Sequence, residues 1–289
     1  MVNKRKIKFK TVTLCCTKSS KEVFSIASQC CEVLSNLGLK VLVEKDLSKL
    51  ASNEAKVSSE SYIKENSDLL VAIGGDGTML NFARKYGPSE IPILGINLGN
   101  LGFLNDIPPN RVTEDLTEVV EGKFDSDKRF FLETSILGRK GIFRALNEVV
   151  IHSGEIAQLI EYEVFINSTF VYRQKADGLI ISSPTGSTGY SLSSGGPIVH
   201  PRVNSLILSP MLPLSLSSSS LIIDAESIVR VVLSQNSRSA QLSFDSHSSL
   251  ILKKGTEIKI SKSNSYVELI HPKENDFFGA CRNKLRWST

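Results

Sequence analysis

The sequence predicts an α/β N-terminal domain with a doubly wound parallel sheet, followed by an all-β C-terminal domain built as a β-sandwich. Three observations support this fold class. Residues 1–123 alternate apolar strand patterns with amphipathic helix patterns, an order typical of parallel sheets covered by helices. Residues 124–270 carry short strand patterns separated by turns, with few helical patterns among them. The length of 289 residues suits two domains, with residues 271–289 as a C-terminal return segment.

The strands and helices of the N-terminal half follow from its apolar periodicity. Ser19 to Glu22 match the S-x-x-E capping box, and apolar residues then recur at steps of three and four, which predicts a helix ending near Gly38. Residues 69–73 are apolar at every position, which favours a parallel strand covered on both faces. The other elements expected in this half are strands at residues 7–14, 40–43 and 91–96 and helices at residues 79–86 and 112–120.

The C-terminal half is predicted to consist of short strands that form two packed sheets. Residues 215–220 are rich in serine but lie between strand patterns, so we expect a loop within the β domain rather than a linker. The strands are expected at residues 130–137, 143–151, 162–171, 221–233, 240–244 and 250–260.

Composition excludes several classes of protein. With 41% hydrophobic and 22% charged residues, the chain is neither disordered, nor collagenous, nor a disulfide scaffold. A net charge of +4 is too small for a nucleic-acid-binding surface, so no nucleic-acid partner is expected. No apolar run approaches the ~18 residues of a membrane span, so no membrane partner is expected either. The five cysteines are odd in number and lack C-x-x-C spacing, which favours a reducing, cytoplasmic location.

The run GGDGT at residues 74–78 is the first candidate binding site. It follows a buried strand and precedes a helix, so its glycines let a ligand approach the backbone and the helix N-terminus offers N–H groups to phosphate. A carboxylate repels phosphate, so Asp76 suggests handling of a hydroxyl, a metal ion or a proton. The alternative is a tight turn in which Asp76 caps the helix. The run is not a Walker loop, because the sequence contains no G-x-x-x-x-G-K-[ST]; it is not the dinucleotide fingerprint either, because Leu80 occupies the third glycine position.

Two further runs carry weaker signals. The run GINLGNLGFL at residues 95–104 begins within an apolar strand pattern, and ligands bind at the carboxyl ends of such strands. Phe103 there either stacks on a planar ring or is a core aromatic behind a glycine turn. Asn147 and Glu148 are adjacent in a strand pattern, so their side chains should point to opposite faces. At least one is then exposed or paired in a site, although an edge strand would also explain the pair.

The longest candidate is ADGLIISSPTGSTGYSLSSGGP at residues 176–197. Hydroxyls and open backbone together suit hydrogen bonds to phosphate, ribose and bases. The alternative is a flexible loop, but the apolar flanks on both sides favour a site. A serine esterase is excluded because the G-x-S-x-G elbow is absent and no histidine has a clear triad context.

Together, these four runs resemble the NAD kinase family, whose motifs occur here in the family's order over residues 69–201. GGDG alone is shared with diacylglycerol-kinase-like lipid kinases and with 6-phosphofructokinases. The TGST-x-Y…SGGP run combined with Asn-Glu is much more specific to NAD kinases. Weaker matches follow at residues 213–217, 243–245 and 285–287, so the resemblance covers most of the chain.

The resemblance implies a Rossmann-like α/β domain joined to a β-sandwich. It also implies transfer of a phosphoryl group from a nucleoside triphosphate (ATP) to the 2′-hydroxyl of the adenosine ribose of NAD, which makes NADP. The expected cofactor is a divalent metal cation, Mg²⁺, bound mainly through ATP, since that ion keeps waters and uses substrate phosphates as ligands. Family members are usually homodimers or homotetramers, so self-association is expected.

The resemblance also implies residue roles. Asp76 matches the family's proposed catalytic base, Asn147 and Glu148 match the pair that lines the adenosine, and Asp177 matches the aspartate that reaches the nicotinamide amide. The expected NAD-binding residues are Gly75, Asp76, Gly77, Phe103, Asn147, Glu148, Lys175, Asp177, Thr188, Gly189, Tyr190 and Ser193. No protein residue is expected to be a dedicated metal ligand.

The sequence departs from the family's pattern at three places. Gly189 replaces the usual alanine of TGSTAY, Ser246 replaces a glycine after Phe-Asp, and Ser219-Ser220 replace a frequent Arg-Pro. These changes bear on donor preference and affinity more than on the reaction.

Two alternative functions fit the sequence less well. A lipid kinase of the diacylglycerol type would need an apolar slot for acyl chains, which the hydroxyl-rich residues 185–194 disfavour. A non-catalytic NAD-binding sensor would have no use for the Asp76 carboxylate. Assays with NAD and with diacylglycerol distinguish these possibilities.

Overall fold

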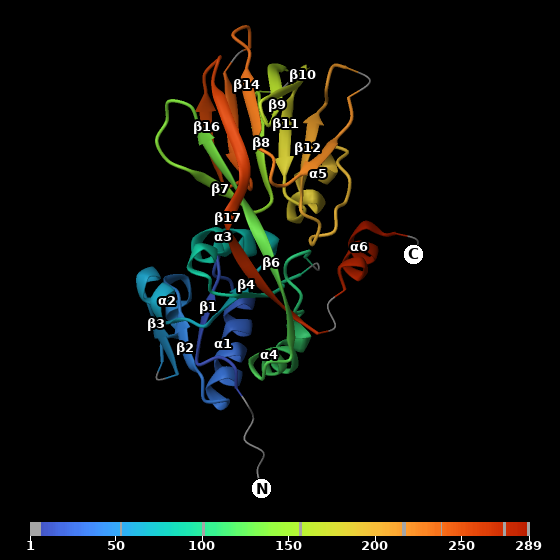
Figure 1. Cartoon of the computed structure of the whole chain (residues 1–289). Coiled ribbons are helices and arrows are strands. Elements are labelled where there is room, and N and C mark those ends of the chain that lie inside the picture. Colours follow the sequence, from blue (N-terminus) through green and yellow to red (C-terminus); the bar gives the residue numbers. More distant parts are fainter. Residues whose placement is uncertain are drawn as a thin grey trace. The chain divides into compact units, whose positions relative to one another are not determined.

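A computed structural model (Figure 1) describes residues 7–52, 54–99, 102–155, 158–215, 218–237, 239–273 and 276–287. The chain forms two compact units, the first of residues 1–128 and 266–289, the second of residues 129–265. Strands β6 (Phe124–Ile136) and β17 (Glu257–Pro272) each contribute residues to both units.

The first unit is built on a parallel sheet, as predicted. Its strand order is β3-β2-β1-β4-β5-β17, and each neighbouring pair is parallel. Both β2 and β4 follow β1, one on each side of it, so the direction of strand addition reverses between β1 and β4. Ligands bind at such a reversal point, beyond the carboxyl ends of the strands. The strands are β1 (Thr11–Cys15), β2 (Lys40–Val43), β3 (Ala55–Val57), β4 (Leu69–Ile73) and β5 (Ile93–Ile96).

The helices that were predicted in the first unit lie close to the expected residues. The cap of α1 differs by one position, because the hydroxyl of Ser20, not Ser19, accepts the hydrogen bond from the Val23 amide at 3.1 Å. This helix ends at Asn36, and Gly38 beyond it has φ +78°, as a terminating glycine does. The helices are α1 (Lys21–Asn36), α2 (Glu60–Asn66), α3 (Asp76–Tyr86), α4 (Val112–Val120) and α6 (Phe277–Leu285), with 3₁₀ turns at Lys45–Leu50, Gly87–Ser89 and Pro109–Arg111.

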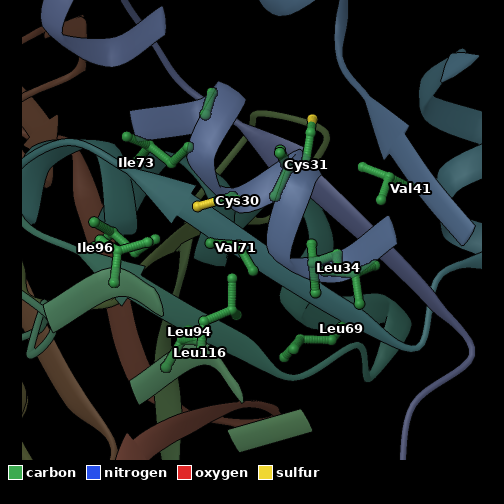
Figure 2. Close-up of a cluster of buried hydrophobic side chains, with 14 of the residues drawn as sticks. Cys30, Cys31, Leu34, Val41, Leu69, Val71, Ile73, Leu94, Ile96 and Leu116 are labelled. Atoms are coloured by element: carbon green, nitrogen blue, oxygen red, sulfur yellow. The ribbon is translucent and has the colours of Figure 1, made fainter. Parts of the chain in front are cut away.

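A close-packed apolar cluster joins α1 and α4 to one face of this sheet (Figure 2). Cys30 and Leu34 of α1 lie against Val71 of β4, with Leu94 of β5 and Leu116 of α4 beside them. All five side chains are fully buried, so the amphipathic stripe read from the sequence is the face that binds the sheet.

The second unit contains two antiparallel sheets, which confirms the expected β-sandwich. One sheet has the order β13-β12-β11-β8-β15-β16, and the other contains β10-β9-β14-β17. Side chains from both sheets form one buried cluster, for example Ile151 and Leu179 from the first with Val164 and Val231 from the second. The strands are β7 (Phe143–Ala145), β8 (Glu148–His152), β9 (Ile160–Ile166), β10 (Thr169–Ala176), β11 (Gly178–Ser182), β12 (Ser205–Met211), β13 (Leu221–Asp224), β14 (Val229–Leu233), β15 (Ala240–Phe244) and β16 (Ser248–Leu252).

Several expected strands are divided in the structure. The pattern at residues 162–171 covers parts of β9 and β10, because Asn167 and Ser168 adopt positive φ angles of 49° and 70° and turn the chain back. The strands β3 and β12 and the helix α2 were not predicted, since they are short or interrupted by serine and proline. Within the described ranges, no helix is both long and apolar enough to cross a membrane.

Leu34→Ala tests whether the α1 interface stabilises the first unit. Because Leu34 is fully buried in the cluster, the change should lower the free energy of unfolding by about 2–5 kcal/mol. Urea denaturation of purified protein measures this loss. Leu137→Ala, at a side chain that is 76% exposed, is the control and should change stability by less than about 0.5 kcal/mol. Equal effects of the two substitutions would contradict the packing described.

Candidate functional site

The GGDGT turn lies at the carboxyl end of β4, next to the end of β1. Gly75 precedes α3, and Asp76 and Gly77 form the first turn of that helix. The hydroxyls of Thr17, just beyond β1, and Thr78 are 2.9 Å apart, so the chain segments after both strands are joined at this turn. The structure thus places the free N–H groups of a helix N-terminus at the reversal point of the sheet.

Asp76 does not cap its own helix, so the capping alternative is wrong. The cap position is Gly75, and no side chain makes the capping hydrogen bond. The Asp76 carboxylate instead accepts hydrogen bonds from the backbone amides of Phe103 at 2.9 Å and Leu104 at 3.2 Å. Gly102 makes this approach possible, because a Cβ there would lie 1.8 Å from Asp76 Oδ1. Asn100 and Leu101 of the same run lie outside the described residues.

Phe103 and Asp76 share a third neighbour that the sequence did not identify. Lys284 of α6 places its Nζ 3.5 Å from Asp76 Oδ2 and 4.4 Å from the centroid of the Phe103 ring. Phe277, also from α6, lies against the Phe103 ring with centroids 6.4 Å apart. The only sequence signal was the weak match at residues 285–287, which says nothing of a lysine near the carboxylate.

Buried polar side chains hold the turn and its helix in position. Asn105 is fully buried and donates from Nδ2 to the Gly74 carbonyl at 3.0 Å. At the other end of α3, Glu44 Oε1 accepts hydrogen bonds from Lys85 Nζ at 2.6 Å and from the Tyr86 hydroxyl. Both ends of the Asp76 helix are therefore fixed to neighbouring strands or loops.

In the second unit, Asp245 shapes the segment that contains Asn147 and Glu148. Its carboxylate accepts hydrogen bonds from the amides of Leu146 at 2.9 Å, Asn147 at 2.8 Å and Glu148 at 3.2 Å. The strand is consequently interrupted between β7 and β8, and the expectation that the two side chains point to opposite faces is wrong. A Cβ on Gly189 would lie 3.1 Å from Glu148 Oε2 and 3.3 Å from Asn147 Nδ2, so both side chains approach Gly189.

Glu148 is a buried carboxyl group with an unusual acidity. Burial, and after it the neighbouring Asp245 carboxylate, raise its pKa, and the backbone amide of Tyr190 opposes the change by hydrogen bonding to the carboxylate; the resulting pKa is about 8. Asn147 Oδ1 and Glu148 Oε2 are buried and lack a hydrogen-bond partner within the described parts of the chain. Because buried polar atoms are normally paired, these two unpaired oxygens suit a polar ligand.

In the hydroxyl-rich run at residues 185–193, some side chains are buried and hydrogen-bonded within the protein, and others are exposed. It forms a 3₁₀ turn (Thr185–Thr188) and the short helix α5 (Tyr190–Ser193). Ser187 and Ser191 are buried and bonded to Val199 and Ser209. Thr188, Tyr190 and Ser193 are partly or fully exposed, with 42% of Tyr190 accessible, so these three predicted residues remain free to contact a ligand.

Predicted residues line two neighbouring cavities in the second unit. Tyr190 and Ser193 line one of about 540 Å³, and Lys175 lines one of about 670 Å³. Ser218 to Ser220 line both cavities. Asp177 lies between β10 and β11, and its amide donates to the carbonyl of Met211, which lines the smaller cavity.

The departures from the family pattern can be placed as well. An alanine at position 189 would bring its Cβ into tight contact with Glu148 and Asn147, and glycine removes that contact. Asp245 and Ser246 have φ angles of +46° and +57°, the left-handed region that glycine adopts most easily. Ser219 and Ser220 line the two cavities, where an Arg-Pro pair would present a cation.

Two family models match the chain. The one described as the ATP-NAD kinase N-terminal domain matches residues 12–124, and the one described as the ATP-NAD kinase C-terminal domain matches residues 146–272. Together they cover more than three quarters of the chain.

Curated relatives and solved structures agree with this result. The NAD kinase of Photorhabdus laumondii is 41% identical over 259 residues, covering 88% of this chain and 89% of the relative. The NAD kinase of Sodalis glossinidius is 43% identical over 261 residues, with the same coverage. A yeast NADH kinase solved with NADH is 27% identical with a TM-score of 0.88, over 97% of this chain and 88% of that one. An Archaeoglobus fulgidus NAD kinase solved with ATP is 26% identical with a TM-score of 0.76, over 94% and 99%.

Glu148→Gln tests the electrostatics of the buried carboxyl group. The pKa of Glu148 in the folded protein, about 8, lies above the ordinary value of 4.5. The protonated carboxyl group therefore contributes its full share of the free energy of unfolding below about pH 4.5, and this contribution is lost as pH rises through 8. One pKa unit corresponds to about 1.36 kcal/mol. Between about pH 4.5 and pH 8, the free energy of unfolding of the wild type should therefore fall by roughly 3–5 kcal/mol more than that of the glutamine variant.

Urea denaturation of ligand-free protein between about pH 5 and pH 8.5 measures the difference. Glu65→Gln, at an exposed carboxylate of α2, is the control and should follow the wild-type curve. Parallel stability profiles for wild type and Glu148→Gln would show that Glu148 is not a high-pKa group.

Proposed function

The chain belongs to the ATP-NAD kinase family, and we propose that it transfers the γ-phosphoryl group of ATP to the 2′-hydroxyl of the adenosine ribose of NAD, which yields NADP and ADP. The matches to both family domains and the relatives at about 40% identity carry the reaction class. The Asp76 carboxylate, held at a glycine-rich turn before a helix N-terminus, is the structural observation that fits this chemistry best.

We assign Asp76 as the base that accepts the proton of the ribose hydroxyl. A hydroxyl is a weak nucleophile, and a carboxylate within hydrogen-bond reach orients it and takes its proton. Two backbone amides fix the Asp76 carboxylate in one orientation. In the transfer, the bond between the γ-phosphorus and the ADP oxygen breaks, the bond from the ribose oxygen to that phosphorus forms, and the hydroxyl proton moves to Asp76. Gly75 and Gly77 leave the backbone of this turn open to NAD.

We assign the second-unit residues to the dinucleotide. Asn147 and Glu148 present unpaired polar atoms suited to the hydrogen-bonding groups of the adenosine. Asp177 is assigned to the nicotinamide amide, and Lys175 to a phosphate because it adds a cation to a cavity rich in serine. Phe103 supplies a ring for stacking. Ribose and phosphates are assigned to the partly or fully exposed side chains near Gly189, which are Thr188, Tyr190 and Ser193.

We propose that the metal cofactor is Mg²⁺, bound mainly through the phosphates of ATP. Among the residues that the structure describes, no group of three His, Cys, Asp or Glu side chains could hold a metal ion. Mg²⁺ suits such a site because it keeps several waters and uses substrate phosphate oxygens as ligands. The carboxylate of the GGDGT turn is that of Asp76. When bound, the ion would neutralise charge on the β- and γ-phosphates.

A reducing, cytoplasmic location fits the five cysteines, which are all free and buried. Self-association into a homodimer or homotetramer stays a prediction, which light scattering of the purified chain would test.

The function is tested by incubating the purified chain with NAD, ATP and Mg²⁺ and assaying for NADP. Phosphorus NMR of the product locates the new phosphate on the ribose. Phosphorylation of diacylglycerol instead of NAD would identify a lipid kinase, and NAD binding without turnover would identify a sensor. A parallel reaction with NADH shows whether the reduced dinucleotide is also accepted.

Asp76→Asn should preserve folding and NAD binding but lower kcat by about 10²–10⁴-fold, the range for loss of a positioned base. Steady-state kinetics and calorimetric NAD titration measure the two effects. Asn66→Asp, at an exposed position at the end of α2, is a control for a carboxylate–amide exchange and should leave kcat unchanged. Turnover of the Asp76 variant near the wild-type rate would remove Asp76 from the base role.

Tyr190→Ala should weaken NAD binding by roughly 1–3 kcal/mol, the scale of a lost aromatic contact or charge-assisted hydrogen bond. Tyr190→Phe should lose less, because the ring remains. Calorimetric titration and melting temperatures of both variants distinguish binding from packing. If the alanine variant binds NAD normally but melts early, Tyr190 supports α5 and does not contact the ligand.

A further inference from the structure

The C-terminal helix α6 places a cation beside the proposed catalytic base. Lys284 Nζ lies 3.5 Å from Asp76 Oδ2, a distance at the outer limit of a hydrogen bond. The same ammonium lies over the Phe103 ring, 4.4 Å from its centroid. The lysine side chain is 26% exposed, so it is neither buried against Asp76 nor free in solvent.

This contact is poorly explained as a fixed structural ion pair. The Asp76 carboxylate is already oriented by the amides of Phe103 and Leu104, at 2.9 and 3.2 Å. A partly exposed pair with a long contact contributes little stability. An ammonium that stayed on Asp76 would also compete with the ribose hydroxyl for the carboxylate, which disfavours proton transfer to that group.

The packing of α6 allows its lysine to change partners. Cys281 is the single buried side chain in the helix. A cavity of about 500 Å³ lies beneath α6, lined among others by Gly102, Arg111 and Gly279. Elements with few buried contacts move at low free-energy cost, and a lysine side chain has four rotatable bonds with which to reach a new partner.

Phosphoryl transfer requires positive charge where Lys284 is placed. The transferred group carries its charge on three equatorial oxygens, and the hydroxyl that Asp76 would hold must lie next to that group. A cation 3.5 Å from the Asp76 carboxylate is therefore within reach of the γ-phosphate once a substrate hydroxyl occupies Asp76.

We propose that Lys284 is a catalytic residue of the phosphoryl transfer. Its ammonium group leaves Asp76 when substrates bind and pairs with the γ-phosphate of ATP. The assignment rests on the proposed function, since it takes Asp76 as the base. Lys284 stays protonated throughout: the γ-phosphoryl group passes from ATP to the ribose oxygen and leaves ADP, the hydroxyl proton passes to Asp76, and the ammonium neutralises charge on the moving group.

The proposal is tested by comparing Lys284→Met with wild type in ATP and ADP binding, measured by calorimetry with Mg²⁺ and without NAD. ADP lacks the γ-phosphate, so the variant should lose roughly 10–100-fold in ATP affinity, the scale of a charge-assisted hydrogen bond, with ADP affinity unchanged. Its kcat for NAD should fall by about 10²–10³-fold. Lys284→Arg keeps the cation and should recover part of both losses.

Arg282→Gln is the matched control on the same helix, because this exposed arginine pairs with Asp276 at 2.8 Å rather than with Asp76. It should bind both nucleotides and turn over like wild type. Melting temperatures of all variants report whether α6 remains folded.

Three results would overturn the proposal. They are wild-type ATP affinity in Lys284→Met, equal losses for ATP and ADP, or a fall in kcat that Lys284→Arg does not relieve. If the wild type fails to phosphorylate NAD, but Lys284→Met still loses affinity for ATP and not for ADP, the proposed function fails and the γ-phosphate contact stands. If wild type is active and Lys284→Met keeps its ATP affinity, the function stands and the lysine assignment fails.

Discussion

In the first unit, the geometry of the candidate site depends on the orientation of one carboxylate, that of Asp76. Asp76 begins α3, yet its oxygens are bonded to amides of Phe103 and Leu104, in the segment after a different strand. The cap position of α3 is Gly75, so Asp76 follows the cap and its carboxylate makes no capping hydrogen bond. The absence of a side chain at Gly102 leaves the space the carboxylate occupies. The result is an anion held in a turn that otherwise suits phosphate, and this arrangement fits the proton transfer proposed for Asp76.

The second unit uses the same kind of interaction at another place. Asp245 accepts hydrogen bonds from three consecutive amides and thereby bends the chain between β7 and β8. The bend brings Asn147 and Glu148 to the same glycine, Gly189, and buries the Glu148 carboxyl group close to a second carboxylate. In both units an aspartate bound to backbone amides of a distant segment sets the direction of the polar groups assigned to the reaction or to the ligand.

Much of this protein was readable from local sequence. The strands at Lys40–Val43, Leu69–Ile73 and Ala240–Phe244 have the predicted bounds, because short apolar or alternating runs next to turn residues leave few other structures open. The family, and with it the reaction class, follows from motifs that are each a continuous stretch of sequence, above all the run at residues 176–197. Apart from Lys175, the residues predicted to bind NAD lie in the motif runs, since glycines and hydroxyls are concentrated where a backbone must contact a ligand.

Only the tertiary structure decided where the polar side chains point. Asp76 and Phe103 are 27 residues apart, Asp245 and Leu146 are 99 apart, and Lys284 and Asp76 are 208 apart. No local pattern encodes a hydrogen bond between such distant residues, and strand periodicity placed Asn147 and Glu148 on opposite faces. The sequence by itself determined most of the longer elements and the family, because periodicity and motif composition are local properties. The tertiary structure decided the partners of Asp76, Glu148 and Lys284, because those depend on which loops the folded sheets bring together.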